Sequence, residues 1–121
     1  MEQKIRRFTD LIAWQKSHKL VLEIYRFTNS FPSHEQFCLT SQLRRCGVSA
    51  SSNIAEGFSR RTIKDKSHFY TMALGSVTEM QNQIFIARDI GYITREDADN
   101  IFKQTEEVYL LLRGLDRGLS R

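Results

Sequence analysis

Residues 51–61 read SSNIAEGFSRR, and this stretch decides whether the middle of the chain is a helix or a strand. In a strand, Ser51, Asn53 and Ala55 would share one face, and no alternation of apolar residues supports that arrangement. An apolar stripe at helical spacing instead runs through the stretch. Its members are Leu39, Leu43, Cys46, Ala50, Ile54 and Phe58. The pattern therefore predicts a helix that ends near residue 60.

The same helical period appears on both sides, and breakers are few, since the chain holds one proline and six glycines. The first helix is expected to begin after Asp10, a good N-cap. It should end at NSFPS, residues 29–33, because the residue before a proline avoids the helical region. Ser33 should cap the second helix, and Gln36 completes a capping-box pattern.

Two more helices follow, each with its own start signal. Thr62 should cap the third, with Asp65 three residues later, and Gly91 should end it. Thr94 should cap the fourth, with Asp97 as its partner. The core stripe predicted for the third helix is Phe69, Met72, Ala73, Ser76, Met80, Ile84, Ala87 and Ile90. That predicted for the fourth is Ile101, Thr105, Val108, Leu112, Leu115 and Leu119.

Four amphipathic helices joined by short turns predict a single all-α domain over residues 1–121, an antiparallel up-down four-helix bundle. The first helix carries two apolar seams side by side, which is a wider face than a solvent-covered helix needs. The seams are Ala13, Leu20, Ile24 and Phe27, and Leu11, Trp14, Val21 and Tyr25. We therefore expect an oligomer in which a neighbouring subunit covers part of this helix, including Trp14 and Tyr25.

Composition favours a cytoplasmic protein without a cofactor or a metal. Apolar residues make up 40% and charged residues 26% of the chain, and no apolar run is long enough to span a bilayer. The start, MEQKIRRF, lacks the apolar region of a signal peptide. Cys38 and Cys46 would lie about two helical turns apart, too far for a disulfide, so both are expected to be free and mostly buried.

Histidines offer one possible catalytic pair. His18, His34 and His68 fall in separate segments, and only His34 and Cys38 share a helical spacing. A Cys–His nucleophile pair is conceivable, but it needs a third orienting group, and a zinc site needs three or four ligands. The structural alternative is a surface histidine near a buried thiol. Because the di-iron and phosphate-loop signatures are also absent, the sequence favours a protein that is not an enzyme.

Basic residues concentrate in the first half of the chain. Residues 1–66 hold twelve Lys and Arg against six Asp and Glu, whereas residues 67–121 hold six against eight. Arg60 and Arg61 at a helix C-terminus could serve the helix dipole alone, but Lys64 and Lys66 near the next helix start could not. We therefore expect a surface that contacts the phosphates of a nucleic acid. Its candidate residues are Lys4, Arg6, Arg7, Arg44, Arg45, Arg60, Arg61, Lys64 and Lys66.

Small residues around Asn53 predict an assembly element. A polar side chain at the edge of an apolar seam can fix register and oligomer state. Asn53 and Glu56 could form a polar network with Arg44 or Arg45, inside or between subunits. The alternative is an ordinary core asparagine with its hydrogen bonds satisfied. Gly75 and Ser76 could offer a matching small surface on the third helix.

Several motifs together resemble a known family, the bacterial four-helix-bundle proteins encoded in intervening sequences of large-subunit ribosomal RNA genes. The resemblance covers nearly the whole chain. The pieces are FTDLIAWQKSHKLVLEIYRFTNSFPSHEQFCLTSQLRR, VSASSNIAEGFSR, FYTMALGSVTEM and ARDIGYI. The matching motif residues are Trp14, Gln42, Arg44, Arg45, Asn53, Ile54, Ala55, Glu56, Gly57, Gly75 and Ser76.

The resemblance implies a helical bundle that assembles as a homopentameric ring and has no established enzymatic activity. A related branch, the accessory protein of diversity-generating retroelements, contacts a reverse transcriptase and nucleic acid. This implies RNA or a nucleic-acid-processing protein as a partner. The chain departs from the family at Ser51, where relatives often have proline, and at Cys38 and Cys46, where small residues are common. The alternative function is a structural or protein-binding scaffold that binds no nucleic acid.

Overall fold

The computed structural model describes residues 4–119, and this part of the chain contains no β-strand. Its four long helices are α1 (Ile12–Thr28), α2 (Leu39–Ser59), α3 (Ile63–Ile90) and α4 (Arg95–Arg117). Two single-turn 3-10 helices precede the first two of them, η1 (Phe8–Asp10) before α1 and η2 (Ser33–Glu35) before α2. The expected all-α class with four helices is confirmed.

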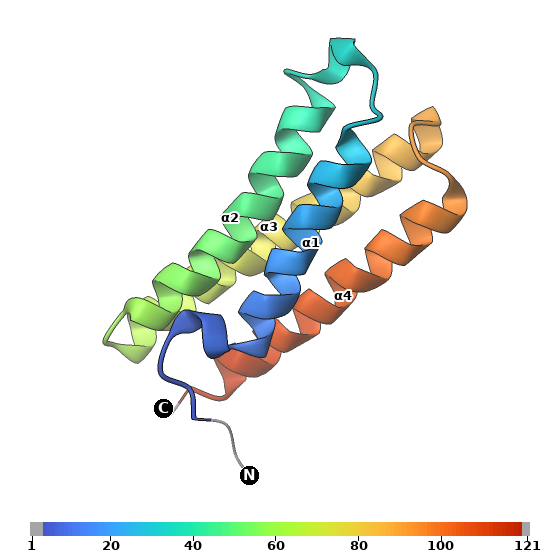
Figure 1. The fold of residues 1–121 in the computed structure, drawn as a ribbon. Helices are drawn as coiled ribbons and strands as arrows, with labels where there is room; N and C mark the ends of the chain where they lie inside the picture. Colours follow the sequence, from blue (N-terminus) through green and yellow to red (C-terminus); the bar gives the residue numbers. More distant parts are fainter. Residues whose placement is uncertain (1–3, 120–121) are drawn as a thin grey trace.

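The helices pack side by side as a bundle. The packed pairs are α1–α2, α2–α3, α3–α4 and α1–α4. Figure 1 shows the α1–α2 and α3–α4 connections at one end, and the α2–α3 connection at the other, near both termini. Within the described range, no helix combines the length and the apolar character that crossing a membrane requires.

The start of α1 differs from the expectation. Asp10 does not cap α1. Its carboxylate accepts the backbone N–H groups of Arg6 and Arg7, at 2.9 and 3.1 Å, and so closes η1. These hydrogen bonds hold the pKa of Asp10 below its usual value. The chain is extended at Leu11, and α1 begins at Ile12.

The start of α2 was also predicted wrongly. Ser33 opens η2 rather than α2, and α2 begins six residues later, at Leu39. The reason is that the chain makes a 3-10 turn after Pro32 and then a further turn before the long helix. Cys38 lies in that last turn and is exposed, contrary to the expectation of a buried thiol, whereas Cys46 is buried as predicted.

The ends of α3 and α4 follow the sequence closely. The Thr62 hydroxyl accepts the Asp65 N–H, and the Thr94 hydroxyl accepts the Asp97 N–H, each at 3.1 Å. Gly91 ends α3 with a φ of 98°, a left-handed conformation that glycine adopts without strain. These predicted caps are confirmed.

The core is formed by one stripe from each helix. The central residues of the stripes predicted for α2 and α4 are buried, whereas their end residues are half-buried, namely Leu39, Phe58, Leu115 and Leu119. For α3 the predicted stripe is partly wrong, because Met72 and Ile90 are exposed and Phe69 is only half-buried. The helix packs against both α2 and α4, so its buried stripe follows the groove between them. The buried residues of α3 are Tyr70, Ala73, Val77, Met80, Ile84 and Ala87.

Candidate nucleic-acid interface

Gly57, in the last turn of α2, lies against the first turns of α3. A Cβ atom at this position would be 2.7 Å from Tyr70 Cε1 and 3.1 Å from Phe69 Cβ. Tyr70 is fully buried, and burial raises the pKa of its hydroxyl. Gly57 therefore serves the packing of α2 on α3. Gly75 differs, because a Cβ there would have no atom within 4 Å.

Asn53 directs its amide back along α2. Its Nδ2 donates to the backbone oxygen of Ser49 at 2.9 Å and to the Ser49 hydroxyl at 3.2 Å. The Ser76 hydroxyl of α3 donates to that same Ser49 hydroxyl at 3.0 Å, so small polar side chains join the two helices. Glu56 is paired with Arg60. Within the described chain, Asn53 and Glu56 thus have partners other than the arginines expected from the sequence.

Two cations near the α2–α3 turn have structural partners. Lys66 Nζ donates to the backbone oxygen of Phe58 at 2.7 Å and so caps the C-terminus of α2. Arg60 pairs with Glu56, and its guanidinium lies 4.6 Å from the centre of the Phe69 ring. Lys66 and Arg60 therefore already have partners on the chain, and their presence at this end needs no bound ligand to explain it.

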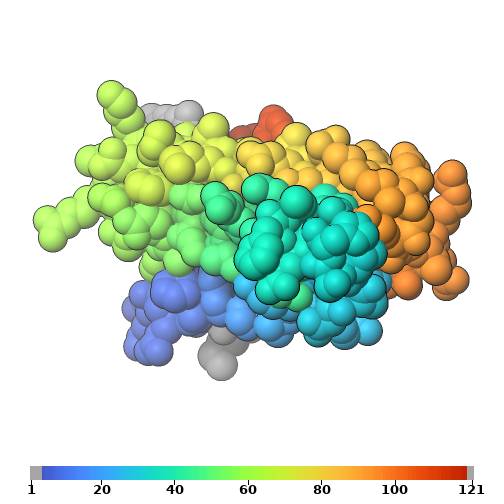
Figure 2. All heavy atoms as spheres, turned by 90° about the horizontal axis from the view of Figure 1, so that it is seen from above, coloured from blue at the N-terminus to red at the C-terminus, as the bar shows by residue number. Residues whose placement is uncertain are grey.

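Other cations at this end are exposed and form no ion pair within residues 4–119. Arg61 lies in the α2–α3 turn, Lys64 lies in the first turn of α3, and Lys4, Arg6 and Arg7 precede η1. Because η1 packs against α2, the N-terminal segment and the turn lie at the same end of the bundle. Figure 2 shows both segments, blue and light green, at one end of the elongated molecule.

Two further arginines lie at this end and were missed from the sequence. Arg113 and Arg117 are exposed in the last turns of α4, which run toward the two chain termini (Figure 1). About fifty residues separate them from the α2–α3 turn, so only the fold brings them near it. We call this region the basic end and define it by its exposed cations. They are Lys4, Arg6, Arg7, Arg61, Lys64, Arg113 and Arg117.

Arg44 and Arg45 lie elsewhere on α2. Arg44 Nε donates to the Thr28 hydroxyl at 2.8 Å, and the Arg44 guanidinium lies 4.6 Å from the Tyr25 ring centre. Arg45 is exposed and has no ion pair among the described residues. At 1.5 Å per residue, Arg45 stands roughly 22 Å along α2 from Arg60. The nine cations predicted from the sequence therefore do not form one surface.

The aromatic residues expected to face a second subunit are partly covered by the chain itself. Trp14 is half-buried, with the His18 ring stacked on it at 4.8 Å and the Phe8 ring edge-on at 5.3 Å. Tyr25 is exposed beside Arg44, and Gln42 is exposed on α2. Their contact with a second subunit stays a proposal.

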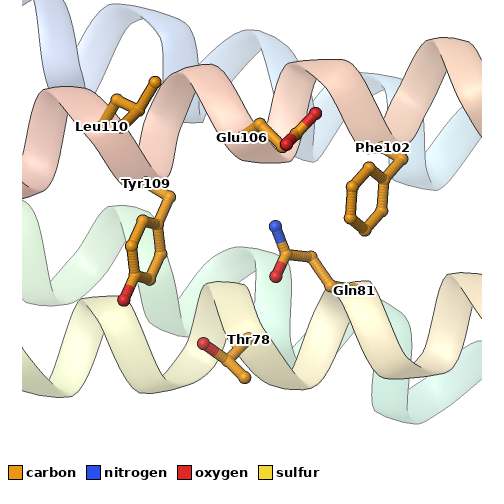
Figure 3. A pocket seen from close by; sticks show the side chains of 6 residues that line it. All are labelled: Thr78, Gln81, Phe102, Glu106, Tyr109 and Leu110. Carbon is orange, nitrogen blue, oxygen red and sulfur yellow. The ribbon is translucent and has the colours of Figure 1, made fainter.

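A cavity of about 300 Å³ lies between α3 and α4. Figure 3 shows the side chains that line it, Thr78, Gln81, Phe102, Glu106, Tyr109 and Leu110. The histidines lie elsewhere: His18 on Trp14, His34 3.3 Å from the Tyr92 hydroxyl, and His68 against Phe69. No group of three potential metal ligands gathers within residues 4–119.

Cys46 faces α3 from inside the bundle. Its thiol donates to a Glu79 carboxylate oxygen at 3.3 Å, and Gln83 Nε2 donates to the sulfur at 3.6 Å. Burial, together with the Glu79 carboxylate, raises the pKa of Cys46 to about 11. Because the thiolate is the nucleophilic form, this cysteine is held in its unreactive state near neutral pH.

Comparison with known proteins identifies related sequences and folds. A sequence profile described as 23S rRNA-intervening sequence protein matches residues 9–114. The chain also resembles a solved structure of a protein of unknown function from the S23 ribosomal protein family of Bacteroides thetaiotaomicron. That likeness has a TM-score of 0.81 and covers 88% of this chain and 96% of that chain. At 22% identity it shows the fold alone. No curated protein matches the chain significantly.

Proposed function

The chain belongs to the 23S rRNA-intervening sequence protein family, and from this premise we propose that it is a non-catalytic scaffold that self-associates and binds RNA. In this proposal the helices form an antiparallel up-down bundle, five copies assemble into a ring, and the protein works in the cytoplasm. The connections at alternating ends of the bundle support the first of these features. The basic end carries the RNA contact.

The observation that carries the RNA contact is the gathering of exposed cations from three separate parts of the chain. Arg61 and Lys64 in particular form no ion pair within residues 4–119. A surface of this kind attracts the phosphate backbone. Phosphate contacts supply affinity and position but little sequence readout, so the proposed binding tolerates many sequences.

Exposed apolar side chains support self-association. On α1, Ile12 is 59% exposed and Leu22 is 58% exposed. Where exposed apolar side chains form a contiguous patch, the patch marks a surface that another molecule covers. In a ring these side chains would lie against neighbouring copies.

The RNA contact is tested by measuring the affinity for a structured RNA as a function of salt. Arg61→Gln/Lys64→Gln should weaken binding and reduce the slope of log K against log salt by about 0.7–0.9 for each phosphate that the variant no longer neutralises. Lys103→Gln, on the first half of α4 near the opposite end, is the matched control and should leave the slope unchanged. A wild-type protein that fails to bind at low salt would remove the RNA contact from the proposal.

The exposed apolar residues also favour a second candidate function, a structural or protein-binding scaffold without nucleic-acid affinity. Both candidate functions predict an oligomer, so the mass of the protein measured by light scattering does not distinguish them. They differ in the RNA titration, because the protein-binding scaffold shows no binding at any salt concentration.

A further inference from the structure

A groove beside the α1–α2 connection combines an exposed aromatic ring with two arginines. Its volume is about 460 Å³, which falls in the range of small-molecule sites. The lining residues come from α1, the turn before α2, and α2 itself. They are Tyr25, Gln36, Phe37, Thr40, Ser41, Arg44, Arg45 and Val48. Figure 2 shows the connection, in cyan, on the side of the molecule that faces the viewer.

Phe37 is the most exposed large apolar residue among those described, at 87%. It lies in the turn between η2 and α2, where it is absent from the buried core. A phenyl ring held in this way offers a flat apolar surface for stacking. Its exposure is otherwise unfavourable, because burying such a ring would release water from a large apolar area.

The charge of the groove selects an anionic ligand. Arg44 and Arg45 both line it, and no carboxylate does. Arg44 is held in place by its hydrogen bonds to Thr28 and Asn29. The nearby Glu35 does not line the groove and instead contacts the Tyr92 hydroxyl, whose pKa is raised by burial and by this carboxylate. The groove therefore presents positive charge beside an aromatic ring.

We propose that this groove binds one unpaired nucleotide of RNA, with its base stacked on Phe37 and its phosphate bound by Arg45. The Gln36 amide lines the same groove and can reach polar atoms of the nucleotide. Stacking of splayed bases on aromatic side chains, with arginine at the phosphate, is a common way to bind single-stranded RNA. The proposal rests on the RNA contact of the proposed function and adds a second site about 22 Å along α2 from the α2–α3 turn.

The experiment uses the full chain and a labelled oligouridine of about ten nucleotides, which has little structure of its own. Phe37→Ala should weaken binding by about fivefold to a hundredfold and leave the salt slope unchanged. Phe37→Tyr should keep the affinity, because its ring also stacks. Arg45→Gln should reduce the salt slope by about 0.7, as expected when one phosphate of a single strand is no longer neutralised. Leu110→Ala, an exposed apolar residue outside the groove, is the matched control and should bind as the wild type does.

Three outcomes would overturn the inference, and they separate it from the proposed function. If the wild type binds oligouridine and all four variants match it, the groove is not the site, while the basic end keeps its role. If Phe37→Ala lowers the mass measured by light scattering, the ring is a contact between copies of the chain. If the wild type binds neither oligouridine nor structured RNA, the RNA contact and this inference fail together.

Discussion

Gly57 and Gly75 show how one residue type can have opposite roles in neighbouring helices. At Gly57 the buried ring of Tyr70 occupies the space that a Cβ atom would need. At Gly75 that space is open. Both are helical glycines in motifs that resemble the family, so their spacing in the sequence alone does not distinguish them.

Gly57→Ala should lower the free energy of unfolding by about 1–3 kcal/mol, because the added methyl group overpacks the contact with Tyr70 and Phe69. Gly75→Ala is the matched control and should raise it by about 0.5–1 kcal/mol, since alanine is the better helix former at an open position. Urea denaturation of the three proteins measures both effects. Equal stabilities for the two variants would contradict the packing role of Gly57.

Cys46 should make the stability fall at alkaline pH. Its pKa is raised from 9.0 to about 11 in the fold, so between these values the unfolded chain releases a proton that the folded chain keeps. The contribution is fully present below pH 9 and is lost as the pH rises toward 11. At about pH 10.5 the loss should reach about 2 kcal/mol relative to about pH 8.

The measurement for Cys46 is urea denaturation at both pH values, with Cys46→Ala as the reference. The Cys46→Ala variant lacks the ionising thiol of Cys46 but keeps the ionising groups of Tyr70 and of the lysines. The difference in stability between wild type and variant should therefore shrink at high pH. A difference that is independent of pH would show that Cys46 ionises equally in the folded and unfolded chains.

At the scale of the elements, the helix ends differ in how far along the chain the residue that caps them lies. Thr62 and Thr94 cap their helices through residues three positions away, which the sequence shows directly. The C-terminus of α2 is instead satisfied by Lys66, from the first turn of the next helix. The α2–α3 turn and the first turn of α3 thus contain one cation, Lys66, that holds the helices together, and two others, Arg61 and Lys64, that form no ion pair within residues 4–119.

Lys66→Gln should lower the free energy of unfolding by about 0.5–1.5 kcal/mol, because the carbonyl of Phe58 loses its charged donor. Lys64→Gln, two residues away in the same turn, is the control and should change stability by less than about 0.5 kcal/mol. The RNA titration should give the reverse order, with Lys64→Gln the weaker binder. Identical behaviour of the two variants in both assays would contradict this division of roles.

At the scale of the whole molecule, exposed cations without an ion pair gather at one end of the bundle. The basic end holds the termini and the α2–α3 turn, whereas the first turn of α4, at the other end, contains Glu96 and Asp97. This polarity would orient the protein as it approaches RNA, with the basic end leading.

Trp14 is the single tryptophan of the chain and reports on assembly. If a neighbouring copy covers the outer face of α1, as we propose, dilution that dissociates the assembly should shift the fluorescence of Trp14 to longer wavelength. Far-UV circular dichroism is the control that shows the helices remain folded. A mass that falls on dilution without any change in emission would place the subunit contact on another face.

Much of the fold could be predicted from the sequence because its determinants are local. The apolar stripes of α2 and α4 depend on spacings of three and four residues, and their central residues are buried as predicted. The start of α2 was not predicted correctly, since Ser33 and Gln36 match a capping box but the chain makes a 3-10 turn there. The apolar residues of α3 are spread around the helix, and packing against α2 and α4 decided which of them are buried.

The sequence by itself therefore determined four helices, the caps of α3 and α4, and an excess of positive charge in the first half. Only the tertiary structure decided which cations are free for a ligand, since Lys66, Arg60 and Arg44 are engaged by partners on the chain. It also brought Arg113 and Arg117 to the basic end and left Phe37 exposed. The physical reason is range: helix formation is set by neighbours within about four residues, whereas the role of a side chain at the surface depends on contacts between distant segments.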